Sequence, residues 1–560
     1  MKTKNVFIGL IALFALSGCT FLDRIFPHKK ENPAEEKDDT SGDGGQSPTE
    51  EKKEIGEFYG GVVNNGSYVG YEFSKSTEDI IKPSSGTGEI NVYAFNDFHG
   101  AVLETNDEVG LKRLGTFYKE KSQERNTLIL DQGDTWQGSF ESNYKHGAIV
   151  QDVFNYAGVT LRTVGNHDFD WGLKQLEDTN NRKLGDDYIP CLASNVFDYK
   201  DGQNGTIQQS KYGKDYATFI LDNGIKVGVV GVIGYKQITS ISSQLVDTIC
   251  FTNHIQRVKR VSDYLRTEKK CDIVIASTHE SSGDIYGLGL DEISTNSKKR
   301  YVDLVLSGHA HYKQEYTSNG VKYVQWDSNG QSTGSIKLKY DFATGSLLDE
   351  QTEVNSYYPN YYKAYYSTIE PTIEKMVDDY LEVTQPVSEL VLSANFSGNW
   401  STTNLAYLMA ESMYFSVKSA GKPIDFAVCN SARDSFNGSE FTFGNLYKCF
   451  PFDNQIILMD VSSSTSCSTI SYSQSYKEDT SIVLSPGITY HVAVIDYVGL
   501  HQNDDREYDR FPDASNQQIY KDGDGNALYY RDILMNYLLD NPTKQFNASD
   551  YTSNNPHFSF

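Results

Sequence analysis

Three absences limit what this 560-residue sequence can encode. It has no run of about 20 apolar residues, which an ordinary membrane-spanning helix needs; the apolar stretch from Val6 to Leu16 has only 11. No two of its seven cysteines form a Cys-x-x-Cys pair, so a thiolate zinc site is not indicated. Cations are also few: 50 Lys and Arg stand against 75 Asp and Glu, and the formal net charge of −25 argues against nucleic acid or anionic lipid as a partner.

The cysteines after residue 19 are expected to be small buried residues. Two of them stand in apolar runs typical of strands, and a disulfide framework is uncommon in a chain of this size. A single bridge stays open as an alternative. These residues are Cys191, Cys250, Cys271, Cys429, Cys449 and Cys467.

The first 18 residues have the pattern of a cleaved targeting signal. Lys2 and Lys4 give it a basic start, an apolar stretch follows, and Leu16-Ser17-Gly18-Cys19 closes it. This tetrapeptide resembles the lipobox of bacterial lipoproteins, and the resemblance implies cleavage before Cys19 and attachment of lipid to its thiol. We therefore expect a lipid-anchored, extracytoplasmic protein of the bacterial cell envelope, with the membrane as a partner through the anchor. An ordinary signal followed by a chance cysteine is the alternative.

The composition then changes several times along the chain. Residues 19–57 are mostly Lys, Glu, Asp, Gly, Ser and Pro, and such a segment is expected to be a disordered acidic and polar tether. About 500 residues remain, which is too many for one core, so two domains are expected. Residues 88–350 alternate short apolar strands with helical stretches, as in a layered α/β domain. Residues 358–384 predict a connecting helix, and the pattern restarts over residues 385–556.

Five short segments carry Asp, Asn and His at spacings that metal chemistry explains. Each follows an apolar, β-branched run, and side chains at such strand ends converge on one edge of an open α/β sheet. The segments are Asn96–His99, Gly133–Asp134, Gly165–Asp170, Thr278–Glu280 and Gly308–His311.

The residue types in these segments suit two divalent ions. Asp97 and His99 are two apart, so on an extended strand end they would face the same side and share one ion. Asp134 has two oxygens to offer, and the glycines beside it permit a tight loop. Carboxylate, amide and imidazole ligands without thiolate favour Zn, Mn, Fe or Co. Such ions would also attract an anionic substrate that the overall negative charge repels.

The five segments, in this order, resemble the calcineurin-like metallophosphoesterases. The matching pieces are Asp97-Phe98-His99, the Gly-Asp-Thr-Trp-Gln-Gly-Ser run at 133–139, the Gly-Asn-His-Asp-Phe-Asp-Trp-Gly run at 165–172, Thr278-His279-Glu280 and the Gly-His-Ala-His run at 308–311. The third run, with a second domain following, looks like the bacterial 5′-nucleotidase branch. This resemblance implies a four-layer α/β/β/α metallophosphoesterase domain followed by a smaller α+β substrate-binding domain.

The resemblance also implies a role for each matching residue. Asp170 is expected to orient His167, a catalytic residue that faces the substrate phosphate, and to keep it protonated. Seven residues are expected to bind metal: Asp97, His99 and His311 for one ion, Asn166, His279 and His309 for the other, and Asp134 as the bridge between them. Other histidines, such as His146, His254 and His501, match no motif and are expected to be ordinary polar groups.

The second domain carries three expected substrate contacts. The resemblance implies that Arg433 forks onto phosphate or carboxylate oxygens and that Phe452 and Tyr497 stack on the two faces of a base. Core aromatics and a surface ion pair are the alternative. The chain departs from the family in having only Ser431-Ala432 between Asn430 and Arg433, and in lacking a Gly-Gly-Asp-Gly stretch after Tyr497. These departures concern the substrate and not the hydrolytic chemistry.

The sequence thus predicts a surface-anchored, dinuclear-metal phosphohydrolase. The expected reaction removes the 5′-phosphate from nucleotides by attack of a metal-activated hydroxide. A related phosphodiesterase or nucleotide-sugar hydrolase is one alternative. A surface protein that binds nucleosides or host molecules, with vestigial catalysis, is another.

Overall fold

The computed structural model describes residues 68–74, 80–198, 208–209, 211–246, 248–500, 510–523 and 525–560. The predicted signal sequence, the lipid-attachment residue Cys19 and the predicted tether lie outside the described residues, as does His501. Within the described ranges, no helix combines the length and the apolar character that a membrane crossing requires.

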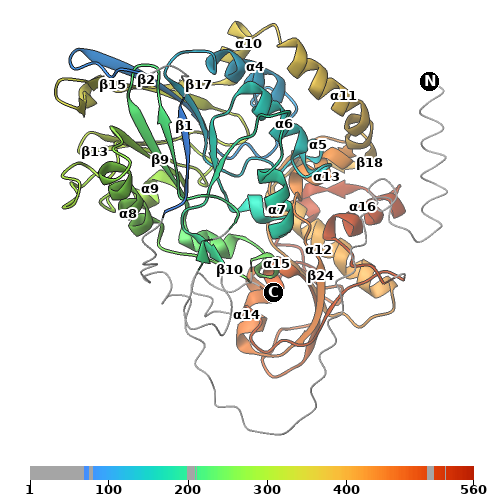
Figure 1. Cartoon of the computed structure of the whole chain (residues 1–560). Coiled ribbons are helices and arrows are strands. Elements are labelled where there is room, and N and C mark those ends of the chain that lie inside the picture. Colours follow the sequence, from blue (N-terminus) through green and yellow to red (C-terminus); the bar gives the residue numbers. More distant parts are fainter. Residues whose placement is uncertain are drawn as a thin grey trace, which may run out of the picture.

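The first part of the chain is built on two facing sheets (Figure 1). Parallel pairing joins the strands that lead to the predicted ligands in both sheets. The first sheet runs in the order β1 (Gly70–Ser74), β8 (Tyr216–Ile220), β9 (Lys226–Ile233), β11 (Ile273–His279), β12 (Leu304–Leu306), β14 (Val321–Gln325) and β13 (Gln314–Ser318). The second runs β16 (Ser346–Leu347), β15 (Thr333–Asp341), β2 (Thr87–Phe95), β3 (Thr127–Asp131), β4 (Leu161–Thr163) and β5 (Cys191–Leu192), with β17 (Glu353–Tyr357) also paired to β15.

Alternation along the strands sorts the apolar side chains into layers. Val92 of β2 points into the core between the sheets, together with Val229 of β9. Its neighbour Tyr93 points outward and packs under the helices on that face. On the other sheet, Val230 points outward under a further helix layer. The domain therefore has the expected four-layer α/β/β/α order.

Helices cover both outer faces of the sheet pair. Over β2 and β3 lie α4 (Leu111–Lys121), α6 (Ala148–Ala157), α10 (Pro359–Tyr365) and α11 (Pro371–Ser388). Over β9 and β11 lies α8 (His254–Thr267). Shorter elements of this domain are α5 (Phe140–Asn143), η1 (His167–Phe169), α7 (Gly172–Asn180), η2 (Tyr235–Ser240), η3 (Ser243–Leu245), α9 (Ser282–Ile285), η4 (Asp349–Gln351) and a small sheet of β10 (Ile249–Phe251), β6 (Val196–Asp198) and β7 (Gln208–Gln209).

The structure differs from the sequence prediction at both ends of this domain. The edge strand β1 lies upstream of residue 88 and pairs in parallel with β8. The single helix expected over residues 358–384 is wrong, because the chain forms two helices with a break at residues 366–370. Pro371 causes the break: proline is favoured in the first turn of a helix but disfavours helical geometry in the residue before it. Glu370 instead caps α11 by accepting from the Ile373 N–H at 2.8 Å.

The second part of the chain is a smaller α+β unit with its own core. Its sheet runs β25 (Gln474–Tyr476), β21 (Phe426–Cys429), β26 (Tyr490–Ile495), β24 (Ile456–Val461) and β27 (Ser515–Ile519). Its helices are α12 (Thr402–Ser419), α13 (Phe443–Cys449), α14 (Ser464–Tyr472), α15 (Asp496–Gly499), α16 (Tyr530–Asp540) and the single turn η5 (Ala548–Asp550). Short strand pairs complete it: β18 (Val391–Ser393) with β23 (Phe441–Thr442), β19 (Phe396–Ser397) with β28 (Phe546–Asn547), and β20 (Asn399–Trp400) with β22 (Phe436–Asn437).

The two units share a packed boundary (Figure 1). Phe140 of α5 belongs to the first unit in sequence but packs in the core of the second. Its ring contacts Phe443 and Tyr447 of α13, with centroids 5.1 and 5.2 Å apart. This contact fixes the loop after β3, which carries a predicted metal ligand, against the second unit.

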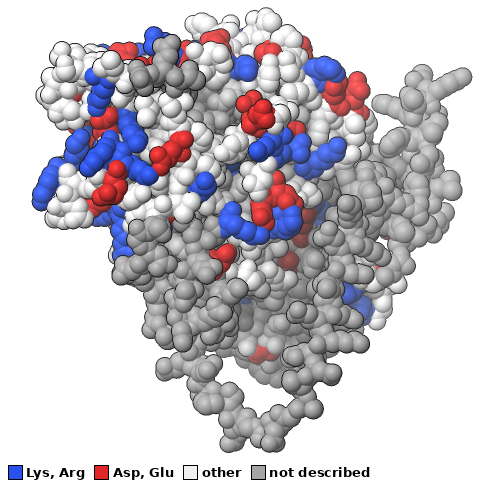
Figure 2. Space-filling model, viewed as in Figure 1, with Lys and Arg blue, Asp and Glu red and all other residues white. Residues whose placement is uncertain are grey.

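All six described cysteines are buried and free, as expected for small core residues. On the face shown in Figure 2, basic and acidic side chains are interspersed over the first unit. Within the first unit, Arg300 pairs with Asp349 at 2.8 Å.

Candidate metal and substrate site

The predicted ligands lie on loops that follow β2, β3, β4, β12 and, for one histidine, at the end of β11. Five of them have positive φ, a region that non-glycine residues seldom adopt: Asp97 (49°), His99 (48°), Asp134 (54°), His309 (78°) and His311 (64°). The expectation that Asp97 and His99 lie on an extended strand end is therefore wrong. They share a site because the loop turns back on itself, and such strained backbone is typical of functional sites.

Neighbouring loops hold this strained backbone in place. The Asp97 N–H donates to the Gly133 carbonyl at 3.0 Å, and the His99 N–H to the Asp134 carbonyl at 2.9 Å. The His309 N–H donates to Asp97 Oδ2 at 2.9 Å. The loops after β2, β3 and β12 thus fix one another.

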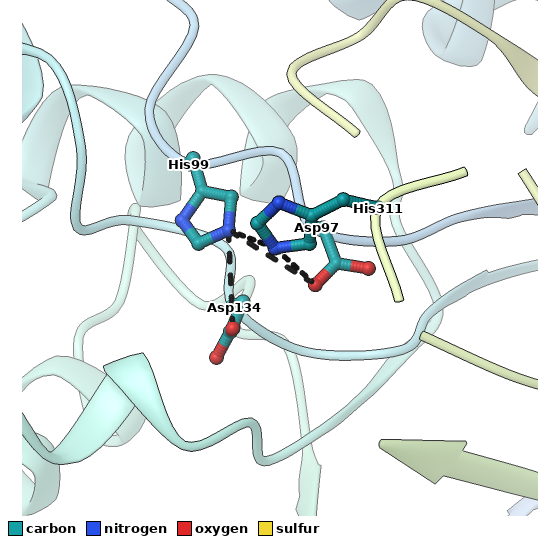
Figure 3. Close-up of side chains that lie close together, drawn as sticks. All are labelled: Asp97, His99, Asp134 and His311. Carbon is teal, nitrogen blue, oxygen red and sulfur yellow. Dashed lines mark hydrogen bonds and ion pairs between the residues drawn. The ribbon is translucent and has the colours of Figure 1, made fainter. Parts of the chain in front are cut away.

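One group of ligand atoms gathers around Asp97 (Figure 3). Its members are Asp97, His99, Asp134 and His311, whose ligand atoms all lie within 4.8 Å of one another. His311 Nε2 is 3.4 Å from Asp97 Oδ1, and His99 Nε2 is 3.9 Å from Asp134 Oδ2. This is the set expected for the first ion, together with the expected bridge.

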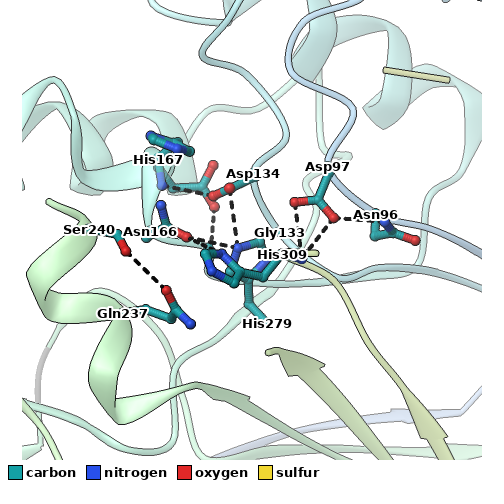
Figure 4. Close-up of polar contacts among 12 residues, drawn as sticks. Asn96, Asp97, Gly133, Asp134, Asn166, His167, Gln237, Ser240, His279 and His309 are labelled. Carbon is teal, nitrogen blue, oxygen red and sulfur yellow. Dashed lines mark hydrogen bonds and ion pairs between the residues drawn. The ribbon is translucent and has the colours of Figure 1, made fainter. Parts of the chain in front are cut away.

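A second group shares Asp134 with the first (Figure 4). His279 Nε2 lies 3.2 Å from Asp134 Oδ2. Asn166 Oδ1 lies 3.0 Å from His279 Nε2 and 3.1 Å from His309 Nδ1. All seven predicted ligands are thus together, and the predicted bridging carboxylate stands between the two groups.

In two of the histidines, Nδ1 forms a hydrogen bond with a backbone carbonyl. His99 Nδ1 lies 2.9 Å from the Gln137 carbonyl, and His279 Nδ1 lies 2.7 Å from the Gln132 carbonyl. A carbonyl only accepts, so each Nδ1 carries its proton and each Nε2 is directed at the ligand cluster. Glycine is needed close by, because a Cβ at Gly165 would lie 2.2 Å from Asp134 Oδ1.

The donor set fits two divalent ions. Asp97 and Asp134 are fully buried, and Asp134 Oδ2 has no hydrogen-bond partner among the described residues. Burial lowers the pKa of His99 to about 3 and that of His309 to about 4, so both imidazoles are neutral and able to ligate. Buried carboxylates without enough cations are costly, and carboxylate, amide and imidazole donors match Zn, Mn, Fe or Co.

His167 and Asp170 are paired as expected, but their protonation differs from the prediction. His167 Nδ1 lies 2.9 Å from Asp170 Oδ2. Burial, to which the Arg433 guanidinium adds, lowers the pKa of His167 to about 4, while burial raises the pKa of Asp170 well above its usual value. The expectation that Asp170 keeps His167 protonated is therefore wrong, because desolvation opposes both charges.

A cavity of about 620 Å³ opens beside the ligand cluster and is lined by both units. The three predicted substrate residues all line it. Arg433 is an exposed residue whose Nη2 lies 3.4 Å from His167 Nε2 and 3.3 Å from His311 Nε2. The Phe452 ring stacks on His167 with centroids 5.1 Å apart and planes 25° apart. Phe452 and Tyr497 also pack partly against the core.

Several cavity residues were not predicted. Trp171 lies within the matching run at 165–172 and Asn454 is two residues after Phe452, so position in the sequence could have indicated both. His146, expected to be an ordinary polar group, pairs with Trp171 at a centroid distance of 5.1 Å. The remaining lining residues lie on η2, on η3 and the loop between them, or in the second unit: Ser240, Ser242, Gln244, Leu245, Asn430, Asp453, Gln455, Asp496 and Tyr529.

Part of the first unit matches a known protein family. Residues 90–313 match the family described as calcineurin-like phosphoesterase, whose members use two divalent metal ions. A 5′-nucleotidase of Diplobatis ommata is 30% identical over 276 residues, which cover 46% of this chain and 45% of that protein. Protein UshA of Yersinia enterocolitica is 23% identical over 430 residues, 68% of this chain and 75% of that protein.

A solved structure has the same architecture. The 5′-nucleotidase precursor of Thermus thermophilus superposes with a TM-score of 0.64 at 16% identity, covering 81% of this chain and 96% of that one. At this identity the likeness concerns the fold. The match to the Diplobatis protein spans less than half of that protein's length.

Proposed function

We propose that this chain, which carries a calcineurin-like metallophosphoesterase domain and has 5′-nucleotidase homologues, removes the 5′-phosphate from nucleotides. One observation carries the proposal: a single cavity connects the two ligand groups to Arg433 and two aromatic rings from the second unit. The phosphate end and the base end of a nucleotide would each find matching chemistry in it.

The seven ligands would hold two divalent ions. The chemistry that such ions supply when bound is Lewis acidity, which activates water and neutralises phosphoryl oxygens. The chain's own groups complete the site. Arg433, next to His167 and His311, offers a guanidinium that binds phosphoryl oxygens.

His167 is placed to handle a proton near the leaving group. Asp170 occupies its Nδ1, so its Nε2 faces the cavity beside Arg433. The raised pKa of Asp170 favours a carboxyl that holds a proton at Nδ1. That proton can move to Nδ1 as the Nε2 proton passes to a leaving oxygen, so the imidazole stays neutral. Phe452 and Tyr497 offer apolar faces for a base, and one face of Phe452 already lies on His167.

Phosphate release from AMP tests the proposal. Protein loaded with Mn²⁺ or Zn²⁺ should release phosphate, and EDTA should abolish the release. The control is the same preparation with a small aryl phosphate, which reports hydrolysis without base recognition. Metal-loaded protein that releases phosphate from neither compound would contradict the proposal and favour a binding protein with vestigial catalysis. Release from the aryl phosphate alone would point to another phosphoester.

We also propose that the protein is a lipoprotein anchored to the cell envelope. The support is the basic start, the short apolar stretch and the Leu16-Ser17-Gly18-Cys19 tetrapeptide. Metabolic labelling with a radioactive fatty acid should mark the wild type and not Cys19→Ala. Equal labelling of the two proteins would contradict the anchor.

A further inference from the structure

The segment that carries Phe452 is held from two sides. Three successive carbonyls, those of Phe450, Pro451 and Phe452, each accept a hydrogen bond from a side chain. The Arg531 guanidinium of α16 donates to Phe450 O at 3.1 Å and also to Phe452 O. Gln137 Nε2 of the first unit donates to Pro451 O at 2.8 Å. Each unit therefore donates hydrogen bonds to the segment from one buried side chain.

Arg531 is built into the second unit. It is only 4% exposed, and its guanidinium also pairs with Asp453 and lies over the Tyr447 ring, 4.1 Å from the centroid. Next to it, the Tyr530 N–H donates to the Asn454 carbonyl at 3.0 Å. A buried guanidinium is costly unless its donors are used, and most of the contacts here fall on the segment from Phe450 to Asn454.

Gln137 connects this segment to the metal ligands. It is 2% exposed, and while its side chain holds Pro451, its own carbonyl lies 2.9 Å from His99 Nδ1. A single residue thus touches both a predicted ligand and the segment next to Phe452. Asn143 Nδ2 also reaches Pro451 O, at the longer distance of 3.3 Å.

We propose that Gln137 and Arg531 form a clamp that sets where the Phe452 ring stands relative to His99 and His167, and that this clamp controls the affinity for nucleotides. The inference rests on the proposed function, because it assigns Phe452 to the base. Gln137 and Arg531 are positioning residues: neither lines the cavity, and both act through Phe452. The affinity for a small aryl phosphate should depend less on the position of the Phe452 ring than the affinity for a nucleotide does.

Three variants weaken the clamp without enlarging the cavity. Gln137→Met keeps the approximate shape but cannot donate. Arg531→Lys keeps the charge but replaces the planar fork of the guanidinium with a single ammonium group, and Arg531→Met removes the charge and all donors. The matched control is Asn155→Ala, since Asn155 is a buried amide of the first unit whose side chain bonds to the Arg182 carbonyl at 3.3 Å, away from the cavity.

The experiment measures KM and kcat for AMP and for p-nitrophenyl phosphate, and the Kd of adenosine by calorimetry. The loss of one buried hydrogen bond should raise KM for AMP about 5-fold in Gln137→Met. Arg531→Met should raise it further, with Arg531→Lys in between. Adenosine Kd should rise in parallel, and KM for p-nitrophenyl phosphate should change less. Asn155→Ala should leave the ratio between the two substrates unchanged.

A double-variant cycle decides whether the effect passes through Phe452. In a Phe452→Ala background, Gln137→Met should add less than about 2-fold to KM for AMP. The clamp would be overturned if Gln137→Met raised the KM for AMP as much in the Phe452→Ala background as in the wild type. It would also be overturned if folded Gln137→Met and Arg531→Lys proteins showed equal KM increases for both substrates. Wild-type protein that hydrolyses neither substrate would instead refute the proposed function. In that case a weaker adenosine Kd in Gln137→Met would still support the clamp, and an unchanged or undetectable one would overturn it.

Discussion

Replacement of the bridging carboxylate should separate metal binding from folding. Asp134 is fully buried and belongs to both ligand groups, and its Oδ2 has no hydrogen-bond partner among the described residues. Asp134→Asn keeps the size and one acceptor oxygen but removes the charge that two ions would share. The backbone N–H of His167 donates to Asp134 Oδ1 at 2.8 Å, and it could keep this hydrogen bond to the amide oxygen of the variant.

Substitutions that only remove a hydrogen-bond partner of a metal ligand give a lower bound for the expected loss of metal affinity. Loss of a hydrogen-bond partner of a metal ligand typically lowers metal affinity about 10- to 100-fold. Loss of the shared ligand's charge should therefore cost at least about 100-fold, which corresponds to about 2.7 kcal/mol. Calorimetric titration of metal-free protein with Mn²⁺ gives the affinity and the stoichiometry directly, and far-ultraviolet circular dichroism checks the fold. Two ions bound with wild-type affinity by Asp134→Asn would refute the bridging assignment.

Three further predictions concern the cavity and the glycine beneath the ligands. Phe452→Ala should raise KM for AMP about 5- to 100-fold, because stacking contributes about 1–3 kcal/mol per base; KM for p-nitrophenyl phosphate should change little, and equal losses would contradict the stacking role. Burial raises the pKa of Asp496 to about 6, so the folded protein binds this proton more readily than the unfolded chain and loses stability as the pH rises from about 4 to 6. Asp496→Asn should therefore raise the free energy of unfolding at pH 8 by up to about 3 kcal/mol and have little effect at pH 4. Chemical denaturation at both pH values measures this. The same difference between variant and wild type at both pH values would contradict the prediction. Gly165→Ala would place a Cβ 2.2 Å from Asp134 Oδ1. It should lower Mn²⁺ affinity at least about 10-fold, and wild-type affinity in the same calorimetric titration would contradict this expectation.

Polar residues follow apolar strands in a recurring order, and the residues predicted from that order as ligands lie together in the structure. Strands β2, β3 and β11 form close to the runs that precede the motifs. Parallel pairing aligns the carboxyl ends of β2 and β3 in one sheet and of β11 and β12 in the facing sheet. The same pattern could not show how the ligands are presented. Asp97 and His99 meet through a left-handed loop held by hydrogen bonds to the loop after β3, and such long-range partners leave no local signal in the sequence.

Features that depend on packing were predicted less well. The protonation of His167 follows from burial and from Arg433, which is distant in sequence and belongs to the other unit. The cavity wall formed by η2, η3 and the loop between them carries Ser and Gln residues without any motif. Strand β1 is short and partly exposed at a sheet edge, where apolar alternation is weakest. In each case, the deciding contact is made by residues far apart in the chain.

The proposed cleavage of nucleotides depends on two metal ions that share the Asp134 carboxylate. The most direct test follows phosphate release from AMP while metal-free protein is titrated with Mn²⁺. The predicted result is activity that is absent without metal, rises as ions are added and levels off at two ions per chain. Full activity without metal or at one ion per chain, or no release from AMP at saturation, would contradict the claim.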